Sequence, residues 1–275
     1  MRRAVKKALA KKLFPEERLQ RIMELIRESK RVEVDDLGDR FEVSGATIRA
    51  DLRELEKRRL VQRTHGGALL HDLKPEISSP EPDPDYQERV ATHIKRKVAI
   101  GQLVAGLIKD DESIMLDDGS TTLQVVRAMK RDLRGTILTN GLNLCYELVK
   151  YPALSVFSTG GRLNKDDMSF QGRVAQDVTS RFHASKAILG ASGVSLERGV
   201  TTPSEEKAEL KKVMMQSSSQ VIIVADSSKI GYASFIEVCP VDEIDTIVTD
   251  DLISPEAGAK LRARGIEVLV ASTGD

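Results

Sequence analysis

Six consecutive residues, Asp117 to Thr122, combine the groups from which proteins build phosphate sites. The segment DDGSTT follows the apolar run SIML and precedes a helical pattern, which predicts a strand end, a glycine turn and a helix start. Free backbone N–H groups at the positive end of a helix, together with hydroxyl donors, favour a bound phosphate. A helix capped by Ser or Thr after an ordinary turn would use the same residues, and both interpretations stay open. The candidate ligand-binding residues in this loop are Asp117, Gly119, Ser120, Thr121 and Thr122.

Polar residues or glycines also end the other apolar runs in this part of the chain. The runs are SIMLDDGS, TILTNG, SVFSTGG, AILGASG, VIIVADSSK and TIVTDD. If they are strands of one parallel sheet, their carboxyl ends meet in a crevice, which is where ligands bind in such sheets. A lysine there supplies a point charge for phosphate, and an aspartate accepts hydrogen bonds from sugar hydroxyls. The further candidates at or near strand ends are Asn140, Gly160, Gly161, Lys186, Asp226 and Lys229.

Residues 43–67 suggest a different chemistry, the recognition of double-stranded DNA. Ser44 is placed to cap a helix by accepting a hydrogen bond from a backbone N–H near Thr47. Apolar residues then recur at i, i+4 and i+7, while Thr47, Arg49 and Arg53 point elsewhere. Arginine can pair bidentately with guanine, and a threonine methyl can contact the thymine methyl in the major groove. An amphipathic surface helix with a solvated charged face is the alternative for this helix taken alone.

The elements around this helix are predicted in the order of a winged helix-turn-helix. An apolar stripe of Leu19, Ile22, Met23 and Ile26 predicts the first helix, 31–34 a short strand, and 35–41 the second helix. A strand then begins at Leu60, followed by a basic, glycine-containing turn that we interpret as the wing. The wing candidates for DNA contact are Arg63, His65 and Gly66.

The second part of the chain alternates strand-like and helix-like segments, which implies a mainly parallel sheet covered on both faces. A long helix is expected from Glu88, with an apolar stripe of Val90, Ile94, Val98, Val104 and Ile108. Four prolines between Lys74 and Tyr86 predict an extended linker before it. Further helices are expected at 121–129, 142–149, 204–216 and 254–263, and a last strand at 268–270.

Charge is distributed unevenly along the chain, although its net charge is zero. Residues 1–74 hold 19 Lys and Arg against 13 Asp and Glu, and six of those positive residues lie in the first fourteen. This basic arm is either a frayed helix on DNA phosphates or a solubilising tail. No transmembrane segment or signal peptide is recognisable, and the two cysteines are expected to be reduced, as in a cytoplasmic protein.

Neither a dinucleotide-binding GxGxxG motif nor a P-loop occurs, and the four histidines form no nucleophile–base arrangement. We therefore expect no catalytic residues, no metal and no cofactor. An enzyme remains the alternative, namely a sugar-phosphate isomerase joined to a DNA-binding module. Such an enzyme needs a base beside the substrate carbons, for which Asp117, Glu206 or Asp226 are available without a distinguishing motif.

The segments VSGATIRADL and RTHGGALL resemble the N-terminal signature of the DeoR family of bacterial transcriptional regulators. The resemblance continues through DDGSTT, Thr139-Asn140, GGRL at 160–163, TTP at 201–203 and DSSK at 226–229. Two positions depart from it. Ala50 replaces the second arginine of the pair, and Lys207 stands where the family often has glutamate, so the resemblance makes the adjacent Glu206 a further effector-binding candidate.

The resemblance implies an α/β protein in which a winged helix-turn-helix domain precedes a Rossmann-like, ribose-5-phosphate-isomerase-like effector domain. The expected divisions are a basic arm at 1–14, the DNA-binding domain at 15–73, a proline-rich linker at 74–87 and the effector domain at 88–275. The expected function is a regulator of carbohydrate-metabolism genes, most often a repressor in this family. Its expected partners are operator DNA, a phosphorylated sugar and further copies of the chain, as a homodimer or homotetramer.

Overall fold

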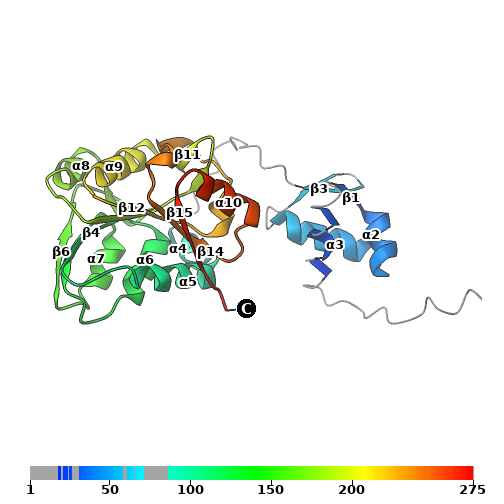
Figure 1. Cartoon of the computed structure of the whole chain (residues 1–275), viewed down its shortest axis with the longest axis horizontal. Helices are drawn as coiled ribbons and strands as arrows, with labels where there is room; N and C mark the ends of the chain where they lie inside the picture. The colour runs from blue at the N-terminus through cyan, green and yellow to red at the C-terminus, as the bar shows by residue number, and fades with distance from the viewer. Residues whose placement is uncertain are drawn as a thin grey trace, which may run out of the picture. The chain divides into compact units, whose positions relative to one another are not determined.

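The chain folds into two compact units, residues 1–74 and 75–275 (Figure 1). The computed structural model describes residues 18, 19, 21–23, 25, 26, 31–57, 61–64, 66–70 and 86–274. The basic arm, His65 and most of the expected linker lie outside these residues. The prediction of a linker is wrong for residues 86 and 87, because Tyr86 is buried and begins a helix.

The first unit has the predicted winged-helix order. Helical residues between Arg18 and Ile26 precede the named elements, which are β1 (Arg31–Glu33), α2 (Val34–Phe41), α3 (Gly45–Lys57), β2 (Val61–Arg63) and β3 (Gly67–Leu70). The three strands form an antiparallel sheet in the order β1-β3-β2. Close packing of this sheet requires glycine at position 67, where a Cβ would lie 1.9 Å from the Val32 carbonyl oxygen.

The predicted apolar stripes form the core of this unit. Ile48, Leu52 and Leu55 of α3 are buried against Leu19, Ile22, Met23 and Ile26. A buried ion pair joins the same two segments, since the Arg18 guanidinium donates two hydrogen bonds to the Asp51 carboxylate. The face of α3 that carries Arg49 and Arg53 is therefore turned away from the core and is exposed.

The second unit is built on a parallel sheet of seven strands in the order β15-β14-β12-β9-β4-β5-β6. Its strands are β4 (Glu112–Leu116), β5 (Gly135–Thr139), β6 (Leu154–Ser158), β9 (Lys186–Gly190), β12 (Val221–Val224), β14 (Thr246–Asp250) and β15 (Glu267–Ala271). These are the six predicted apolar runs and the predicted last strand. The prediction of a parallel α/β sheet is confirmed.

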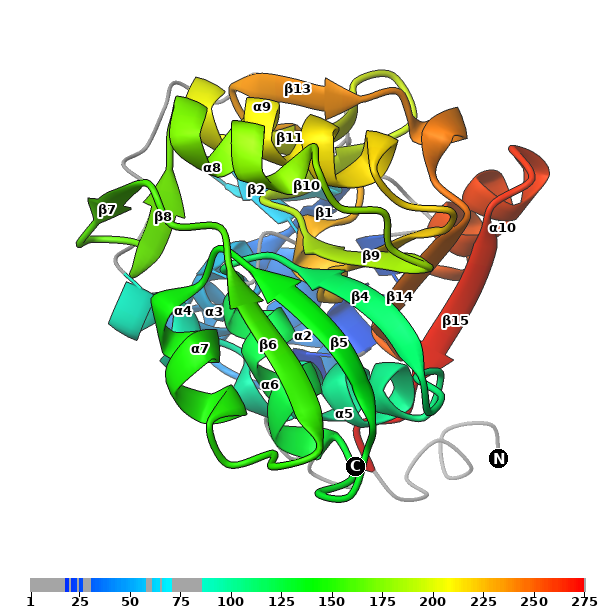
Figure 2. The same ribbon diagram turned by 90° about the vertical axis from the view of Figure 1, so that its left-hand side faces the viewer.

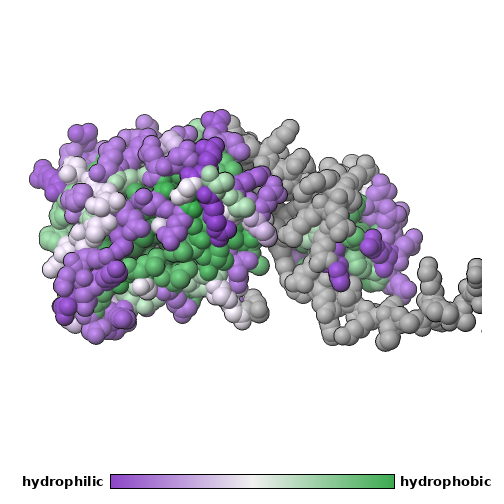
Figure 3. Space-filling view, viewed as in Figure 1, coloured by the Kyte–Doolittle hydropathy of each residue, from purple (hydrophilic) through white to green (hydrophobic). Residues whose placement is uncertain are grey.

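Helices cover both faces of this sheet (Figures 1 and 2). One hydrophobic core lies under α5, α6 and α7, and the other lies under α8, α9 and α10. The helices are α4 (Tyr86–Ala91), α5 (Ile94–Ala105), α6 (Ser120–Ala128), α7 (Leu142–Leu148), α8 (Arg173–Thr179), α9 (Glu205–Gln216) and α10 (Pro255–Ala263). Space filling shows the charged and polar residues over the outer helices and the apolar residues nearer the sheet (Figure 3).

Several short elements were not predicted. A small antiparallel sheet has the order β10-β11-β13, from β10 (Gly193–Ser195), β11 (Gly199–Thr202) and β13 (Ile236–Cys239). A hairpin joins β7 (Arg162–Asn164) to β8 (Ser169–Gln171), and 3₁₀ turns occur at η1 (Ser227–Lys229) and η2 (Val241–Glu243). These strands have three or four residues each, which is too short for a recognisable periodicity.

The long helix expected from Glu88 is wrong in two respects. It is divided into α4 and α5, because His93 takes a left-handed conformation with φ of 53°. Its buried face is also different, since Lys97 is buried while Ile94 and Val98 are exposed. In the part of the chain that the structure describes, every helix is too short or too polar to cross a membrane.

Candidate functional site

The amino end of α6 presents free hydrogen-bond donors at the carboxyl end of β4. Its N-cap residue is Gly119, which has no side chain to accept from the first turn. The hydroxyl of Thr122 donates back to the carbonyls of Asp117 and Gly119, at 2.9 and 2.7 Å. Ser120 and Thr121 therefore lie inside the helix and do not cap it. The backbone N–H groups of this first turn are left for an anion, as a phosphate site requires.

A buried lysine lies directly behind this helix end. The Nζ of Lys97, on α5, donates to the Ser120 hydroxyl at 3.0 Å and also to the Arg89 carbonyl. Burial lowers the pKa of Lys97 to about 8, against the opposing attraction of Asp226. Asp226 and Lys229, at the end of β12, contribute to the potential at this lysine. The loop therefore combines helix N–H groups with a cation, which suits a phosphate dianion.

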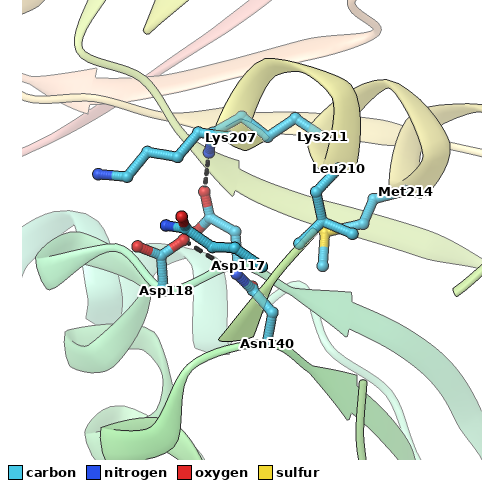
Figure 4. Close-up of a pocket in the computed structure, with 8 residues that line it drawn as sticks. Asp117, Asp118, Asn140, Lys207, Leu210, Lys211 and Met214 are labelled. Carbon is cyan, nitrogen blue, oxygen red and sulfur yellow. Dashed lines mark hydrogen bonds and ion pairs between the residues drawn. The ribbon is translucent and has the colours of Figure 1, made fainter. Parts of the chain in front are cut away.

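A small pocket opens beside this loop, between the sheet and α9 (Figure 4). Its lining residues are Asp117, Asp118, Asn140, Gln171, Lys207, Leu210, Lys211 and Met214. The Asp117 carboxylate forms a buried ion pair with Lys211 and also accepts a hydrogen bond from the Gly190 N–H at 2.8 Å. Asp117 and Lys211 thus line the pocket as an ion pair whose charges neutralise each other.

Asn140 brings an unused acceptor into the same pocket. Its amide nitrogen donates to the Asp118 carboxylate at 3.2 Å and to the Phe170 carbonyl at 3.3 Å. Its amide oxygen is buried without a hydrogen-bond partner among the described residues. A buried acceptor left without a donor costs about 1–3 kcal/mol, so a ligand hydroxyl that donates to this oxygen would recover that free energy.

Lys207 is held at the other side of the pocket by acidic groups. Its ammonium donates to the Asp167 carboxylate at 2.7 Å, and Arg89 donates to the same carboxylate at 3.0 Å. Burial alone would lower the pKa of Lys207, but Asp118 and Asp167 outweigh it and raise the pKa. Burial raises the pKa of Asp167, yet Lys207 and Arg89 bring it below its ordinary value. Lys207 and Asp167 are therefore both charged near neutral pH.

Of the predicted ligand residues, Asp117 and Asn140 line this pocket, whereas Lys186 and Glu206 are held elsewhere by ion pairs. Lys186 is the first residue of β9, at the amino edge of the sheet, where its ammonium pairs with Glu112. The prediction that it lies at the ligand-binding end is wrong, because parallel strands place their first residues at the opposite edge. Glu206 points outward to Arg162, whereas Lys207 enters the pocket.

The two glycines after β6 adopt positive φ angles, 59° at Gly160 and 107° at Gly161. A Cβ on Gly161 would lie 2.8 Å from the Gln171 carbonyl oxygen, so this position requires glycine for packing. A Cβ on Gly160 would meet no atom within 4 Å. Packing alone therefore explains the glycine at position 161, without any ligand contact.

Lys97, Lys207 and Lys211 were not among the predicted site residues. Lys97 lay within a helix whose buried face was assigned to other residues. Lys207 and Lys211 are four residues apart on α9, so they share one helix face with Leu210 and Met214. That i, i+4 spacing, in a helix directly after the TTP segment, is the signal in the sequence that could have identified them.

The DNA-binding candidates gather on and next to α3. The Ser44 hydroxyl accepts from the Thr47 N–H at 3.2 Å, as predicted for a helix cap, and contacts the Thr47 hydroxyl at 2.9 Å. Arg49 and Arg53 are exposed, and the Arg53 Nε donates to the Arg49 carbonyl at 3.2 Å. These two guanidiniums retain further donors, which face solvent.

On the wing, Arg63 pairs with Glu56 of α3 at 3.4 Å, so a DNA contact by this arginine would compete with the ion pair. Gly66 is exposed, and its carbonyl accepts from the Val34 N–H at 2.8 Å. In the described ranges, no group of three or more His, Cys, Asp or Glu residues could hold a metal ion.

Comparison with known families accounts for both units. A model of the DeoR-like helix-turn-helix domain matches residues 18–73, and a model of the DeoR C-terminal sensor domain matches residues 92–251. Together the two matches extend over most of the chain, including α3 in the first unit and the loop before α6 in the second.

Several curated proteins are similar over nearly their whole length. The HTH-type transcriptional regulator GlpR of Haloferax volcanii is 33% identical over 94% of this chain and 98% of its own. The HTH-type transcriptional repressor GlcR of Bacillus subtilis is 33% identical over 94% and 97%. The transcriptional repressor AccR of Agrobacterium fabrum is 32% identical over 86% and 89%. These relatives are named as regulators and not as enzymes.

Solved structures show more distant likenesses. A ribose 5-phosphate isomerase A from Methanocaldococcus jannaschii is 14% identical, covers 49% of this chain and 53% of its own, and has a TM-score of 0.36. The translation initiation factor eIF-2B of Pyrococcus horikoshii is 16% identical over 80% and 68%, with a TM-score of 0.39. Scores this low support no inference about function.

Proposed function

This chain belongs to the DeoR family of transcriptional regulators, and from that membership we propose that a phosphorylated sugar bound in its second unit controls operator binding by its first. The protein is a DNA-binding regulator with a C-terminal sensor domain. We propose a DNA-binding domain at 15–73 and an effector domain that begins with α4, at 86–275. We also propose that it represses carbohydrate-metabolism genes, as a homodimer or homotetramer.

The observation that carries the proposal is the uncapped start of α6 beside Lys97. The N-cap Gly119 leaves backbone donors free, and the Lys97 ammonium reaches Ser120 from behind. A phosphate placed here accepts from the N–H groups and the hydroxyls of Ser120 and Thr121 and is neutralised by Lys97 and Lys229. Few uncharged metabolites could use such a concentration of donors, because each donor must find an acceptor when it is buried.

The neighbouring pocket suits the hydroxylated part of the same ligand. The Asn140 oxygen is an acceptor for a sugar hydroxyl, while Asp118 and Asp226 are further acceptors at strand ends. Lys207 and Lys211 are donors that already pair with Asp167 and Asp117. Ligand hydroxyls can therefore enter this network by exchanging hydrogen bonds without leaving a charge unpaired.

We assign DNA recognition to the exposed face of α3 that carries Arg49 and Arg53, which would read the bases. Ser44 and Thr47 at the start of this helix, and the wing, would make further DNA contacts. Sugar-phosphate binding and operator binding must then be coupled reciprocally, since each ligand changes the affinity for the other by the same factor.

Thermal-shift measurements against a panel of pentose and hexose phosphates test the proposal, with the matching unphosphorylated sugars as controls. A ligand at 100 times its dissociation constant adds about 2.7 kcal/mol to the free energy of unfolding. We expect stabilisation by at least one sugar phosphate, no stabilisation by its parent sugar, and a change in operator affinity when that ligand is added. Equal stabilisation by parent sugar and phosphate would contradict the assignment of the α6 loop.

A further inference from the structure

The edge strand β6 is exposed to an unusual degree for an apolar strand. It ends the seven-stranded sheet beside β5 and has the sequence LSVFS (Figures 1 and 2). Its last four residues are exposed, although successive side chains point to opposite faces of a sheet. Both faces of the strand are therefore accessible, whereas a strand that only closes a sheet usually buries one of them.

The hydrogen-bonding direction of β6 can be derived from its end. The Thr159 N–H donates to the Thr139 carbonyl of β5 at 3.0 Å. Backbone groups alternate in direction along a strand, so those of Phe157 also face β5 and those of Val156 point away from the sheet. Among the described residues, the outward N–H and carbonyl of Val156 have no partner. Such an edge is a template for pairing with another strand.

Apolar side chains surround this open edge. Val156 is 38% exposed, and Phe157, which contacts Phe182 edge to face, is still 45% exposed. Tyr146 and Val149, at the end of the adjacent α7, are 75% and 82% exposed. We call Tyr146, Val149, Val156 and Phe157 the β6 patch. Figure 2 shows α7 beside β6 on this side of the unit.

The opposite edge of the same sheet is protected. The Arg262 guanidinium donates to the Val268 carbonyl of β15 at 3.2 Å, and β15 starts with the charged Glu267. Two of its five side chains, Val268 and Ala271, are buried. Charged residues at an edge and donors that occupy its carbonyls prevent strand addition. β6 has no charged residue, and among the described residues no side chain donates to the outward carbonyl of Val156. The β6 edge is therefore open to strand addition, whereas the β15 edge is protected.

We propose that β6 is a self-association surface, on which β6 of a second copy pairs antiparallel across a two-fold axis. Val156 of each copy then lies opposite its equivalent, and the two residues exchange both N–H···O=C bonds. This symmetry places both α7 helices on the same face of a continuous sheet, so that the two copies of Tyr146 and Val149 approach each other. An isologous contact of this kind closes a dimer and leaves no further β6 edge.

The charge of the β6 patch and its exposed apolar area both suit binding to a second copy of this chain. β6 itself carries no charge, and the nearby Glu147 and Lys150 neutralise each other at 2.8 Å, so two identical surfaces meet without repulsion. With about 200 Å² for a fully exposed aromatic side chain, Tyr146 and Phe157 contribute roughly 480 Å² over two copies. That is a large part of the roughly 1,000 Å² that marks a biological interface.

This inference locates the self-association that the proposed function assumes, and it can fail separately from that function. Sedimentation equilibrium of the full chain, with and without Val156→Lys, tests it. The substitution places two like charges directly opposite each other, and we expect the β6–β6 dissociation constant to rise at least about tenfold. A dimer should become a monomer and a tetramer a dimer, while Tyr146→Glu and Val149→Lys act in the same direction.

Val270→Lys is the matched control, because Val270 is 41% exposed and lies on the protected β15 edge. It should leave the mass unchanged. Hydrogen exchange in wild type gives a second measurement that needs no folded variant: the Val156 amide should lose protection on dilution. A monomeric wild type, an unchanged mass for all three β6-patch variants, or dissociation by Val270→Lys alone would overturn the inference. Sugar-phosphate titration of Val156→Lys reports separately on the proposed function.

Discussion

The Nζ atom of Lys97 lies 3.0 Å from the Ser120 hydroxyl oxygen, which places a buried amine against the first residue of α6. The two residues come from helices that both pack on the same face of the sheet, α5 and α6. Lys97 is 5% exposed and Ser120 is 7% exposed. A charge at this depth requires compensation, and a bound phosphate is the compensation that the neighbouring helix N–H groups also select.

Ligand affinity should therefore depend on pH through Lys97. Burial lowers its pKa to about 8, so the free protein loses this charge as the pH rises through that value. We expect sugar-phosphate affinity to fall above about pH 8, and also below about pH 6, where the phosphate takes up a proton. Near pH 8 binding should take up protons, which calorimetry in two buffers of different ionisation enthalpy measures. In Lys97→Met the affinity should be lower and its decline above pH 8 should disappear.

The same shift has a consequence for the stability of the unliganded protein. Between about pH 8 and the ordinary lysine pKa of 10.5, the unfolded chain holds the Lys97 proton and the folded chain does not. The contribution of Lys97 to the free energy of unfolding should therefore increase with pH in this window. Subtracting the pH profile of Lys97→Met from that of wild type isolates this contribution, and a difference that does not rise there would contradict the assigned environment.

Operator binding should depend on the two arginines at the front of α3. Both Arg49 and Arg53 are exposed on the side opposite buried Ile48 and Leu52, so replacing them leaves the core intact. Arg53→Ala should cost about 1–3 kcal/mol of binding free energy if the guanidinium reads a base. Gel-shift titration against operator and random DNA measures the loss. Arg173→Ala, at an exposed arginine of the second unit, is the control, and unchanged affinity in both Arg49→Ala and Arg53→Ala would refute the assignment.

Stability of the first unit should depend on the ion pair between Arg18 and Asp51. Both side chains are buried, so removing one leaves the other charge buried without this ion-pair partner, and breaking a buried ion pair typically costs about 3–5 kcal/mol. Arg18→Met and Asp51→Leu should each destabilise this unit strongly, and the double variant should destabilise it less than their sum. Chemical denaturation followed by circular dichroism gives the three values. Additive effects would show that the pair contributes no coupling.

Much of the architecture followed from local patterns in the sequence. Apolar runs that end in polar residues or glycine predicted six of the seven strands of the large sheet, since such runs are long enough to be distinctive, and the last strand was predicted separately at 268–270. The cap predicted at Ser44 is confirmed, since its hydroxyl accepts from the Thr47 N–H. The helices expected at 204–216 and 254–263 also start where predicted, with Ser204 and Ser254 as their N-caps. The winged-helix order followed from stripes of three or four apolar residues.

The arrangement of charges in the site could not be predicted in this way. Lys97 and Lys211 are buried against Ser120 and Asp117. These partners lie 23 and 94 residues away in sequence, so local patterns could not indicate the contacts. Nothing in the immediate neighbours of Lys97 distinguishes it from an exposed lysine, and only the i, i+4 spacing with Lys207 marks Lys211. The misplacement of Lys186 has a related cause, because a charged residue next to an apolar run can lie at either edge of a sheet.

Isothermal titration calorimetry of the double variant Ser120→Ala, Thr121→Ala tests the phosphate site most directly. The titrant is the sugar phosphate found in the thermal-shift panel, and Ser254→Ala, which removes a cap from α10 in the same unit, is the control. We expect the double variant to bind that ligand at least about tenfold more weakly, since two hydroxyl contacts to a charged group are lost. It should still bind operator, and it should not respond to the ligand. Ligand affinity equal to that of wild type would contradict a phosphate site at the start of α6.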